Sequence, residues 1–424
     1  MRVLYSLLLY LATPAALAYL ALRGIGDRAY LRRWRERFAF FRRPERPGGI
    51  WIHAASLGEV NAAEPLIRAL ADAWPDRDLY LTTFTPTGSA RVRERFGDDV
   101  FHVYSPLDLP GSVRRFFNRL RPGLAVIMET EIWPNLYHEM ARRGIPSLLA
   151  NARISDHSFD RYRRFSRLTG PALAGVTRIG AQSGNDADRL RTIGTPADRL
   201  SVTGNLKFDI ELPGGLQADG AAIRASWGDT RPVLVAGSTH EAEEAPLFDA
   251  FTRLLADLPD ALLVLVPRHP ERFDRAARAA ADAGLRTARR SGHQNCPADV
   301  QCYVIDAMGE LLRYYAACDV AFVGGSLEPV GGHNVLEPAA LARPVVVGPH
   351  TFNFADITRS LLDAGAAAQV ADAGELAAVL GDLFGNPEQR GRMGEAGARL
   401  VKQGQGAVNR TLALARTVFT AEAG

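Results

Sequence analysis

Short apolar runs alternate with helix-like segments along nearly the whole chain, and this alternation limits the folds that the sequence can adopt. It is typical of parallel sheets built from right-handed strand–helix–strand units. The sequence therefore predicts an α/β protein in which two such sheets follow each other. The candidate strands are residues 50–55, 79–84, 124–128, 147–150 and 178–181 in the first half, and 232–236, 261–266, 302–305, 320–323 and 344–347 in the second.

A stretch rich in glycine, proline and aspartate, NLKFDIELPGGLQADG, separates the two halves and is expected to be a linker. We predict two Rossmann-like domains facing a central cleft, in which ligands bind at the carboxyl ends of the strands. The expected divisions are an anchor at 1–22, a basic segment at 23–48, an N-terminal domain at 49–205, the linker at 206–220 and a C-terminal domain at 221–424. The last helix of the chain could pack back on the N-terminal domain instead of on the C-terminal domain.

The N-terminal residues 3–22 carry no charge, and their number matches the roughly 20 residues that span a ~30 Å hydrocarbon core. We favour an uncleaved anchor helix that crosses the membrane. A helix lying in the interface remains an alternative, because Pro14 and several small residues weaken the span. Removal as a signal peptide is a third, since AALA at 15–18 offers a cleavage site, although arginines follow it directly.

Positive charge is concentrated just after this apolar segment. Residues 23–46 hold nine arginines and three acidic residues, a net +6, whereas the whole chain carries only +3. Positive charge stays on the cytoplasmic side, where arginines can meet anionic headgroups. A nucleic-acid partner is not expected, because basic charge is confined to one short segment instead of covering a docking face.

The cysteines and histidines do not form a recognisable metal motif. Cys296, Cys302 and Cys318 are not spaced as a zinc site and are expected to stay reduced thiols in a cytosolic body. His240 and Glu241 lack the second histidine of the HExxH motif. We therefore expect neither a metal nor a cofactor.

Glu59 follows the first strand and stands near the start of an alanine-rich helix. The helix N-terminus favours the ionised carboxylate, and an ionised carboxylate at a cleft can act as a general base toward a hydroxyl. The alternative is an ordinary first-turn glutamate that only stabilises the helix dipole.

Glu129 and Glu131 follow the strand at 124–128 in the segment IMETEIWPNL. They could cap a helix that begins near Pro134, or they could belong to a site. Two carboxylates at this place need a cationic partner, and Lys207 in GNLKFD could supply the charge to them or to an anionic substrate. The alternative for Lys207 is a solvated side chain.

The second half resembles an anion and nucleoside site. Arg268 ends a buried strand, and its guanidinium suits phosphate. Ser238 and Thr239 offer hydroxyls at the start of a helix, although both are also common N-caps. In VGGSLEPVGGHNVLEPAA, residues 323–340, glycines allow close backbone approach, the following helix start favours phosphate, and Glu337 can accept from ribose hydroxyls.

Eight motifs in this order carry a resemblance to a known family: HAASLGEV, METEIWPN, NARISDHS, GNLKFD, STHEAEE, VPRHPERF, MGEL and GGHNVLEPA. The chain resembles the bacterial 3-deoxy-D-manno-octulosonic acid (Kdo) transferases, which add Kdo to lipid A precursor. The resemblance covers nearly the whole chain, including the apolar N-terminus and its arginines. It implies a GT-B-type glycosyltransferase with an inverting reaction, CMP-Kdo as donor and no metal at the phosphate.

The resemblance also implies roles for individual residues. The general base falls on Glu59, and the transition-state stabilisers fall on Glu129 and Lys207. The N-terminal domain would then hold the acceptor and the C-terminal domain CMP-Kdo, at the cytoplasmic face of the inner membrane. The implied CMP contacts are Pro267, Arg268, Met308, Gly309, Glu310, Asn334, Val335, Leu336 and Glu337.

Two other functions fit the same pattern. A sugar-nucleotide epimerase or a lipid-A-disaccharide-type transferase could use two Rossmann-like domains, because fold does not fix function. A membrane-tethered binding protein with a degenerate site would bind CMP without turnover. The sequence leaves open how many Kdo units are added, which acyl chains the acceptor needs and how many subunits assemble.

Overall fold

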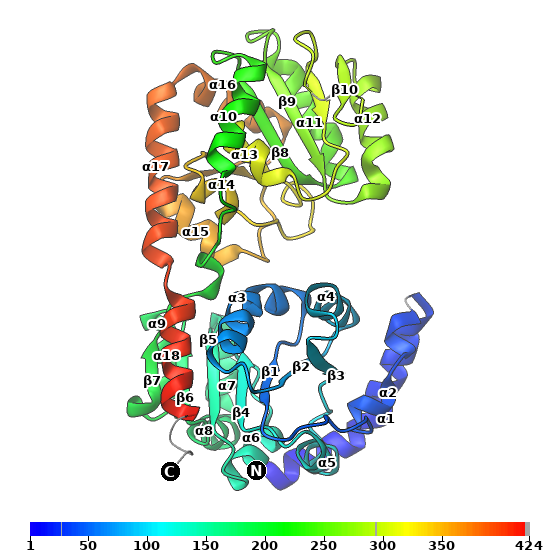
Figure 1. Ribbon diagram of the computed structural model, residues 1–424, viewed down its shortest axis with the longest axis vertical. Coiled ribbons are helices and arrows are strands. Elements are labelled where there is room, and N and C mark those ends of the chain that lie inside the picture. Colours follow the sequence, from blue (N-terminus) through cyan, green and yellow to red (C-terminus); the bar gives the residue numbers. More distant parts are fainter. Residues whose placement is uncertain (27, 293–294, 420–424) are drawn as a thin grey trace. The chain divides into compact units, whose positions relative to one another are not determined.

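The computed structural model describes residues 1–26, 28–292 and 295–419. The chain divides into two compact units, one formed by residues 1–209 and 404–424 and the other by residues 210–403. Figure 1 shows a helix-covered sheet in each unit. Both sheets have seven strands, and every recorded strand pair within them is parallel. The prediction of two Rossmann-like domains is confirmed.

The first sheet has the order β3-β2-β1-β4-β5-β6-β7. Its strands are β1 Ile50–His53, β2 Leu79–Thr83, β3 Val100–Tyr104, β4 Leu124–Met128, β5 Ser147–Ala152, β6 Arg178–Ala181 and β7 Leu200–Val202. The helices of this unit are α1 Arg2–Gly26, η1 Arg28–Leu31, α2 Trp34–Arg37, α3 Leu57–Ala73, α4 Pro86–Phe96, α5 Pro110–Leu120, α6 Pro134–Arg142, α7 Asp156–Arg164, α8 Ser166–Ala174, α9 Gly184–Ile193, η2 Ala197–Arg199, η3 Leu206–Phe208 and α18 Ala407–Phe419. The strand order reverses between β1 and β4, and in such sheets ligands bind at this reversal.

The second sheet has the order β10-β11-β9-β8-β12-β13-β14, and its order reverses between β8 and β12. Its strands are β8 Val233–Thr239, β9 Leu262–Pro267, β10 Thr287–Arg289, β11 Cys302–Val304, β12 Val320–Val323, β13 Val345–Val347 and β14 Ala367–Gln369. The helices are α10 Leu216–Trp227, α11 Glu241–Leu254, η4 Pro270–Arg272, α12 Phe273–Asp282, α13 Leu311–Ala317, α14 Leu336–Ala340, α15 Ala355–Asp363, α16 Ala373–Gly385 and α17 Pro387–Gly404.

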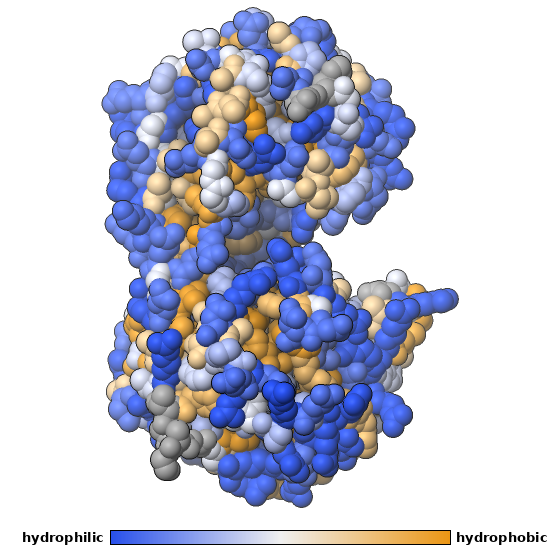
Figure 2. All heavy atoms as spheres, viewed as in Figure 1, coloured by the Kyte–Doolittle hydropathy of each residue, from blue (hydrophilic) through white to orange (hydrophobic). Residues whose placement is uncertain are grey.

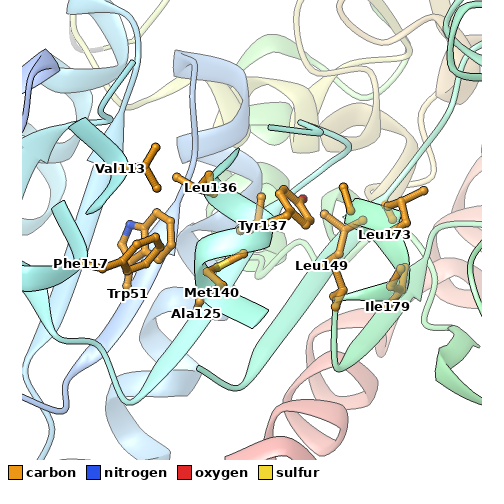
Figure 3. Packing of buried hydrophobic residues seen from close by; sticks show 14 of the residues in the cluster. Trp51, Val113, Phe117, Ala125, Leu136, Tyr137, Met140, Leu149, Leu173 and Ile179 are labelled. Atoms are coloured by element: carbon orange, nitrogen blue, oxygen red, sulfur yellow. The ribbon is translucent and has the colours of Figure 1, made fainter. Parts of the chain in front are cut away.

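The central strands form because their side chains are apolar on both faces, as expected for a sheet covered by helices on both sides. Every residue of β1, β4, β8, β9 and β12, apart from Ser238, is buried. In the first unit the aromatic rings of Trp51 and Phe117 lie 5.6 Å apart within one apolar cluster (Figure 3). On the other face of that sheet, α18 contributes Ala407, Ala415 and Val418 to the cluster under α3. The well-packed sheets hold the loops at the strand ends in place.

Four strands were not predicted, namely β3, β7, β10 and β14. Each contains partly exposed residues, so none of them forms the continuous buried run that identifies a central strand.

Cys296, Cys302 and Cys318, which we expect to be reduced thiols, are buried and form no disulfide.

Candidate active site

Glu59 stands in the first turn of α3, immediately after β1 at the reversal point of the first sheet. One carboxylate oxygen accepts from the Ala55 backbone N–H at 2.9 Å, and the other accepts from the Ser56 hydroxyl at 3.0 Å. The side chain is only 9% exposed. Burial, followed by the negative charges of Glu131 and Glu129, raises the pKa of Glu59 to about 7. A carboxylate with this pKa can take a proton near neutral pH.

Glu131 is held by a buried histidine that sequence reasoning did not select. His53 Nε2 lies 2.9 Å from Glu131 Oε2, and the Trp133 indole N–H donates to the same oxygen at 3.0 Å. On the other side of the ring, His53 Nδ1 lies 2.8 Å from Thr82 Oγ1, which also accepts from Trp51 Nε1 at 2.9 Å. Burial opposes the charged ring, but the hydrogen bond and charge of Glu131 raise the pKa of His53. The same contact lowers the pKa of Glu131 against its own burial, so the two form an ion pair.

The structure gives Glu131 a cationic partner, His53, on the neighbouring strand. It also corrects one interpretation of Glu131, which does not cap α6, although that helix does begin at Pro134. The backbone N–H groups of Asn135 and Leu136 donate instead to the carboxylate of Asp108, at 3.0 and 2.8 Å.

Glu129 follows β4 with a backbone φ of 55°, in the left-handed region that non-glycine residues rarely adopt. Asn151, at the corresponding end of β5, also has a φ of 55°. Such conformations cost about 1–3 kcal/mol and concentrate at functional sites. The two strained residues therefore mark the same edge of the sheet as Glu59.

Lys207 lies in η3, directly after the buried Leu206. The backbone N–H of Leu206 donates to Asn151 Oδ1 at 3.0 Å, and that of Lys207 donates to Asn205 Oδ1 at 3.0 Å. Asn151 thus fixes the turn that carries Lys207, and sequence reasoning assigned it no role. The structure therefore places Glu59, Glu129 and Lys207 in one unit.

The predicted CMP contacts all lie in the other unit. Pro267 ends β9, and Arg268 follows it with an exposed side chain, while its backbone N–H donates to the Thr239 carbonyl at 3.0 Å. The N-cap of α11 is His240, so the interpretation of Ser238 and Thr239 as N-caps is wrong. Ser238 has a φ of 58°, which indicates a sharp turn at the end of β8.

Glu337 is tied to the other residues of the GGHN segment. Asn334 Nδ2 donates to Glu337 Oε1 at 3.1 Å, and Asn334 Oδ1 accepts from the Leu336 N–H at 3.2 Å. Burial raises the pKa of Glu337, while the Asn334 hydrogen bond and the Arg268 charge oppose that shift. Because α14 has only five residues, its dipole is a smaller source of phosphate attraction than the sequence suggested.

Glycines give the loop after β12 its shape. Gly325, Gly331 and Gly332 have φ values of 69°, 108° and 75°, in the region that favours glycine. A Cβ at Gly324 would lie 2.6 Å from the Ser238 carbonyl oxygen, so the loops after β8 and β12 touch at this point. The loops at the reversal of the second sheet therefore depend on glycine.

Met308, Gly309 and Glu310 form a turn before α13. Met308 is 56% exposed, and Gly309 has a φ of 83°. Glu310 accepts from the Tyr314 hydroxyl at 3.2 Å and lies 3.6 Å from Arg290 Nε. The Met308 side chain of this turn is therefore exposed, whereas the Glu310 carboxylate is held within the unit.

Two histidines and a buried glutamate join the loops of the second sheet, and sequence reasoning did not select them for the site. His240 Nε2 and His333 Nε2 lie 2.9 Å apart, so at least one ring is neutral. Glu243 is fully buried and accepts from the backbone N–H groups of Gly325 and His240. Burial, followed by nearby positive charge, lowers the pKa of His333 to about 4. Glu243 therefore ties together the two loops that carry these histidines.

A family model and two sequence relatives point to one family. A family model described as 3-Deoxy-D-manno-octulosonic-acid transferase (kdotransferase) matches residues 32–210. The 3-deoxy-D-manno-octulosonic acid transferase of Haemophilus influenzae is 41% identical over 97% of this chain and 97% of its own length. The enzyme of the same name from Bordetella pertussis is 40% identical, covering 86% of each chain.

A solved structure supports the fold. The putative UDP-N-acetylglucosamine 2-epimerase of Listeria monocytogenes matches with a TM-score of 0.54 at 16% identity, over 89% of this chain and 97% of its own. At this identity the likeness shows the fold alone, and together with the two parallel sheets it confirms the GT-B-type class. From its sequence relatives, the chain belongs to the Kdo transferase family of glycosyltransferases.

Proposed function

We propose that the protein transfers Kdo from CMP-Kdo to a lipid A precursor, lipid IVA, in lipopolysaccharide synthesis, with inversion at the anomeric carbon. The body would lie at the cytoplasmic face of the inner membrane. The observation that carries this proposal is the buried Glu59 carboxylate, whose pKa is raised to about 7 beside the end of β1. Family membership makes transfer of Kdo the expected reaction.

In the proposed reaction Glu59 takes the proton of the acceptor hydroxyl. The hydroxyl oxygen forms a bond to the anomeric carbon of Kdo, and the bond from that carbon to the CMP phosphate oxygen breaks. The electron pair leaves with CMP, and the centre inverts because the hydroxyl attacks from the face opposite CMP. Arg268 and the backbone N–H groups near Asn334 would stabilise the negative charge on CMP.

Glu129 and Lys207 are proposed to act on the sugar. The carboxylate of Glu129 would favour positive charge at the anomeric carbon, and Lys207 would neutralise the Kdo carboxylate or the departing phosphate. The residues proposed to bind CMP are Pro267, Arg268, Met308, Gly309, Glu310, Asn334, Val335, Leu336 and Glu337.

Radiolabelled CMP-Kdo incubated with purified protein and lipid IVA tests the proposal. Label should move to the lipid, and mass spectrometry of the product should give the number of Kdo units. An epimerase, or a transferase of another sugar, would leave the lipid unlabelled.

Activity should depend on the protonation of Glu59. Because only the ionised carboxylate accepts a proton, and its pKa is about 7, kcat/KM should fall about tenfold per pH unit below pH 7 and level off above it. The measurement is kcat/KM between pH 5.5 and 8.5 with donor stability checked at each pH. A rate that stays constant down to pH 5.5 would exclude this base.

Glu131→Gln should shift the low-pH fall of kcat/KM to lower pH. The negative charge of Glu131 raises the pKa of Glu59 more than the positive charge of His53 lowers it. Removing the Glu131 charge, even with loss of the His53 proton, should therefore lower the pKa of Glu59. The same pH series measures the shift. A fall of kcat/KM that begins at higher pH in this variant would contradict the claim that the Glu131 charge raises the pKa of Glu59.

A further inference from the structure

The first turns of α1 are bonded to the body of the first unit. The Tyr5 hydroxyl donates to Asp108 at 3.0 Å, and the Ser6 hydroxyl donates to Asn135 Oδ1 at 3.0 Å. Arg2 donates to the same Asn135 oxygen at 3.3 Å. Asp108 is 3% exposed and also caps α6, so the attachment point is part of the folded core. The start of α1 therefore lies against the body.

The chain returns to the body soon after the other end of α1. Gly24 packs so closely on Leu31 that a Cβ there would lie 2.3 Å from that side chain. Arg33 then donates to the His102 carbonyl at 2.9 Å and to the Ser89 hydroxyl at 3.0 Å. Arg37 is 1% exposed and donates to the Phe84 carbonyl at 2.9 Å. Of the nine arginines between residues 23 and 46, these two thus face the protein, which corrects the expectation that all of them meet headgroups.

These two attachments are incompatible with a helix that crosses a bilayer. At 1.5 Å per residue, the 25 residues of α1 measure about 37 Å, so a crossing would put its ends on opposite sides of a ~30 Å core. The start of α1 is nevertheless bonded to the body, and the chain is bonded to the same body again at Arg33, seven residues after α1 ends. The seven residues from 27 to 33 reach at most about 25 Å when extended, and they include Arg28 and Arg32, which would have to lie in hydrocarbon.

The side of α1 away from these bonds is apolar and open. Leu4, Leu8, Leu11, Leu22 and Ile25 are 52, 55, 70, 66 and 82% exposed, and their spacing of three or four residues, continued by Ala15 and Ala18, puts them on one stripe. Figure 2 shows apolar side chains on the part of α1 that projects at the right edge of the view. Seven arginines nearby are exposed, namely Arg23, Arg28, Arg32, Arg35, Arg42, Arg43 and Arg46. Apolar stripe and exposed cations together fit an anionic bilayer surface.

We infer that α1 lies in the plane of the membrane interface, with its apolar stripe in the lipid and both of its ends on the side of the body. This inference rests on the proposed membrane attachment and decides against the crossing helix that the sequence favours. The body would then be held directly at the headgroups, where a lipid acceptor is confined.

Cysteine labelling tests which side each end occupies. Because the three native cysteines are buried, a cysteine in a short tag before Met1 can be labelled selectively. Ser226→Cys, on the exposed end of α10, serves as the marker for the body. In spheroplasts, a membrane-impermeant maleimide should label neither position, and both should be labelled after permeabilisation. Labelling of the tag alone in intact spheroplasts would overturn the in-plane helix while leaving membrane attachment intact.

A matched pair of lysine substitutions gives a second, independent readout. Leu11→Lys introduces charge on the stripe and should move the protein from the membrane to the soluble fraction. Thr13→Lys, on the less exposed opposite side, should leave it membrane-bound, whereas a crossing helix would suffer equally from a charge at either mid-helix position. CMP affinity checks folding of both variants. Equal release by the two lysines would overturn the inference, and unmodified protein found only in the soluble fraction would overturn the proposed attachment as well.

Discussion

Glu59→Gln should lower kcat by roughly 100-fold or more at saturating donor and acceptor, the scale of general base catalysis. The amide cannot accept the proton, but it can still accept the hydrogen bond from the Ala55 backbone N–H. The N-terminal turn of α3 should therefore keep its shape. CMP affinity should stay close to normal, because the proposed CMP contacts lie in the other unit.

Glu64→Gln provides a matched control on the same helix. Glu64 is five residues further along α3 and pairs with Arg68 and Arg95, away from the strand end. Its substitution should leave kcat near the normal value. Turnover of Glu59→Gln within a few-fold of normal would remove Glu59 from the role of base.

The central strands could be predicted from the sequence because they are buried on both faces. Runs such as LAVIM in β4 and VAFV in β12 contain no polar residue to interrupt the pattern. The edge strands could not be predicted in the same way, since β10 and β14 have only three residues each and lie half-exposed at the ends of the sheet. Their place is set by the neighbouring strand.

Only those site residues that directly follow a strand could be predicted from the sequence. Glu59 was found because a carboxylate that starts a helix after a strand has a recognisable local pattern. His53 was missed because it lies within β1 and looks like an interruption of that strand. Its partner Glu131 follows β4, which is 71 residues away from β1 in the sequence but adjacent to it in the sheet. Predicting such a pair requires the order of the strands in the sheet, and the local sequence pattern does not give that order.

The same limit applies to the second sheet. The glycine-rich segment before α14 was found from its sequence, but its attachment to the loop after β8 through Glu243 was not. Glu243 occupies a helical position that reads as a solvated surface residue next to Glu241 and Glu244. Its burial results from the contact between the two loops.

Arg268→Ala and Glu337→Ala should each weaken CMP binding by about 10- to 150-fold, the equivalent of the ~1.5–3 kcal/mol of a hydrogen bond to a charged group. Arg268 is exposed, so water competes for its guanidinium and its effect should fall at the lower end of this range. Glu337 is held by Asn334 and partly shielded, so loss of its carboxylate should fall at the upper end. Titration calorimetry with CMP at pH 7.5 measures both effects.

Glu337→Gln and Arg278→Ala separate the possible causes of such a loss. The glutamine keeps an oxygen for the Asn334 side chain, so it should hold the loop in shape while removing the charge. Its CMP affinity should lie between those of the wild type and Glu337→Ala if the carboxylate accepts from the ribose, and should equal the wild type if Glu337 only supports the loop. Arg278 is an exposed cation on α12, and its substitution should leave the Kd unchanged. If Arg268→Ala and Glu337→Ala both bind CMP as tightly as this control does, the nucleotide binds elsewhere on the protein.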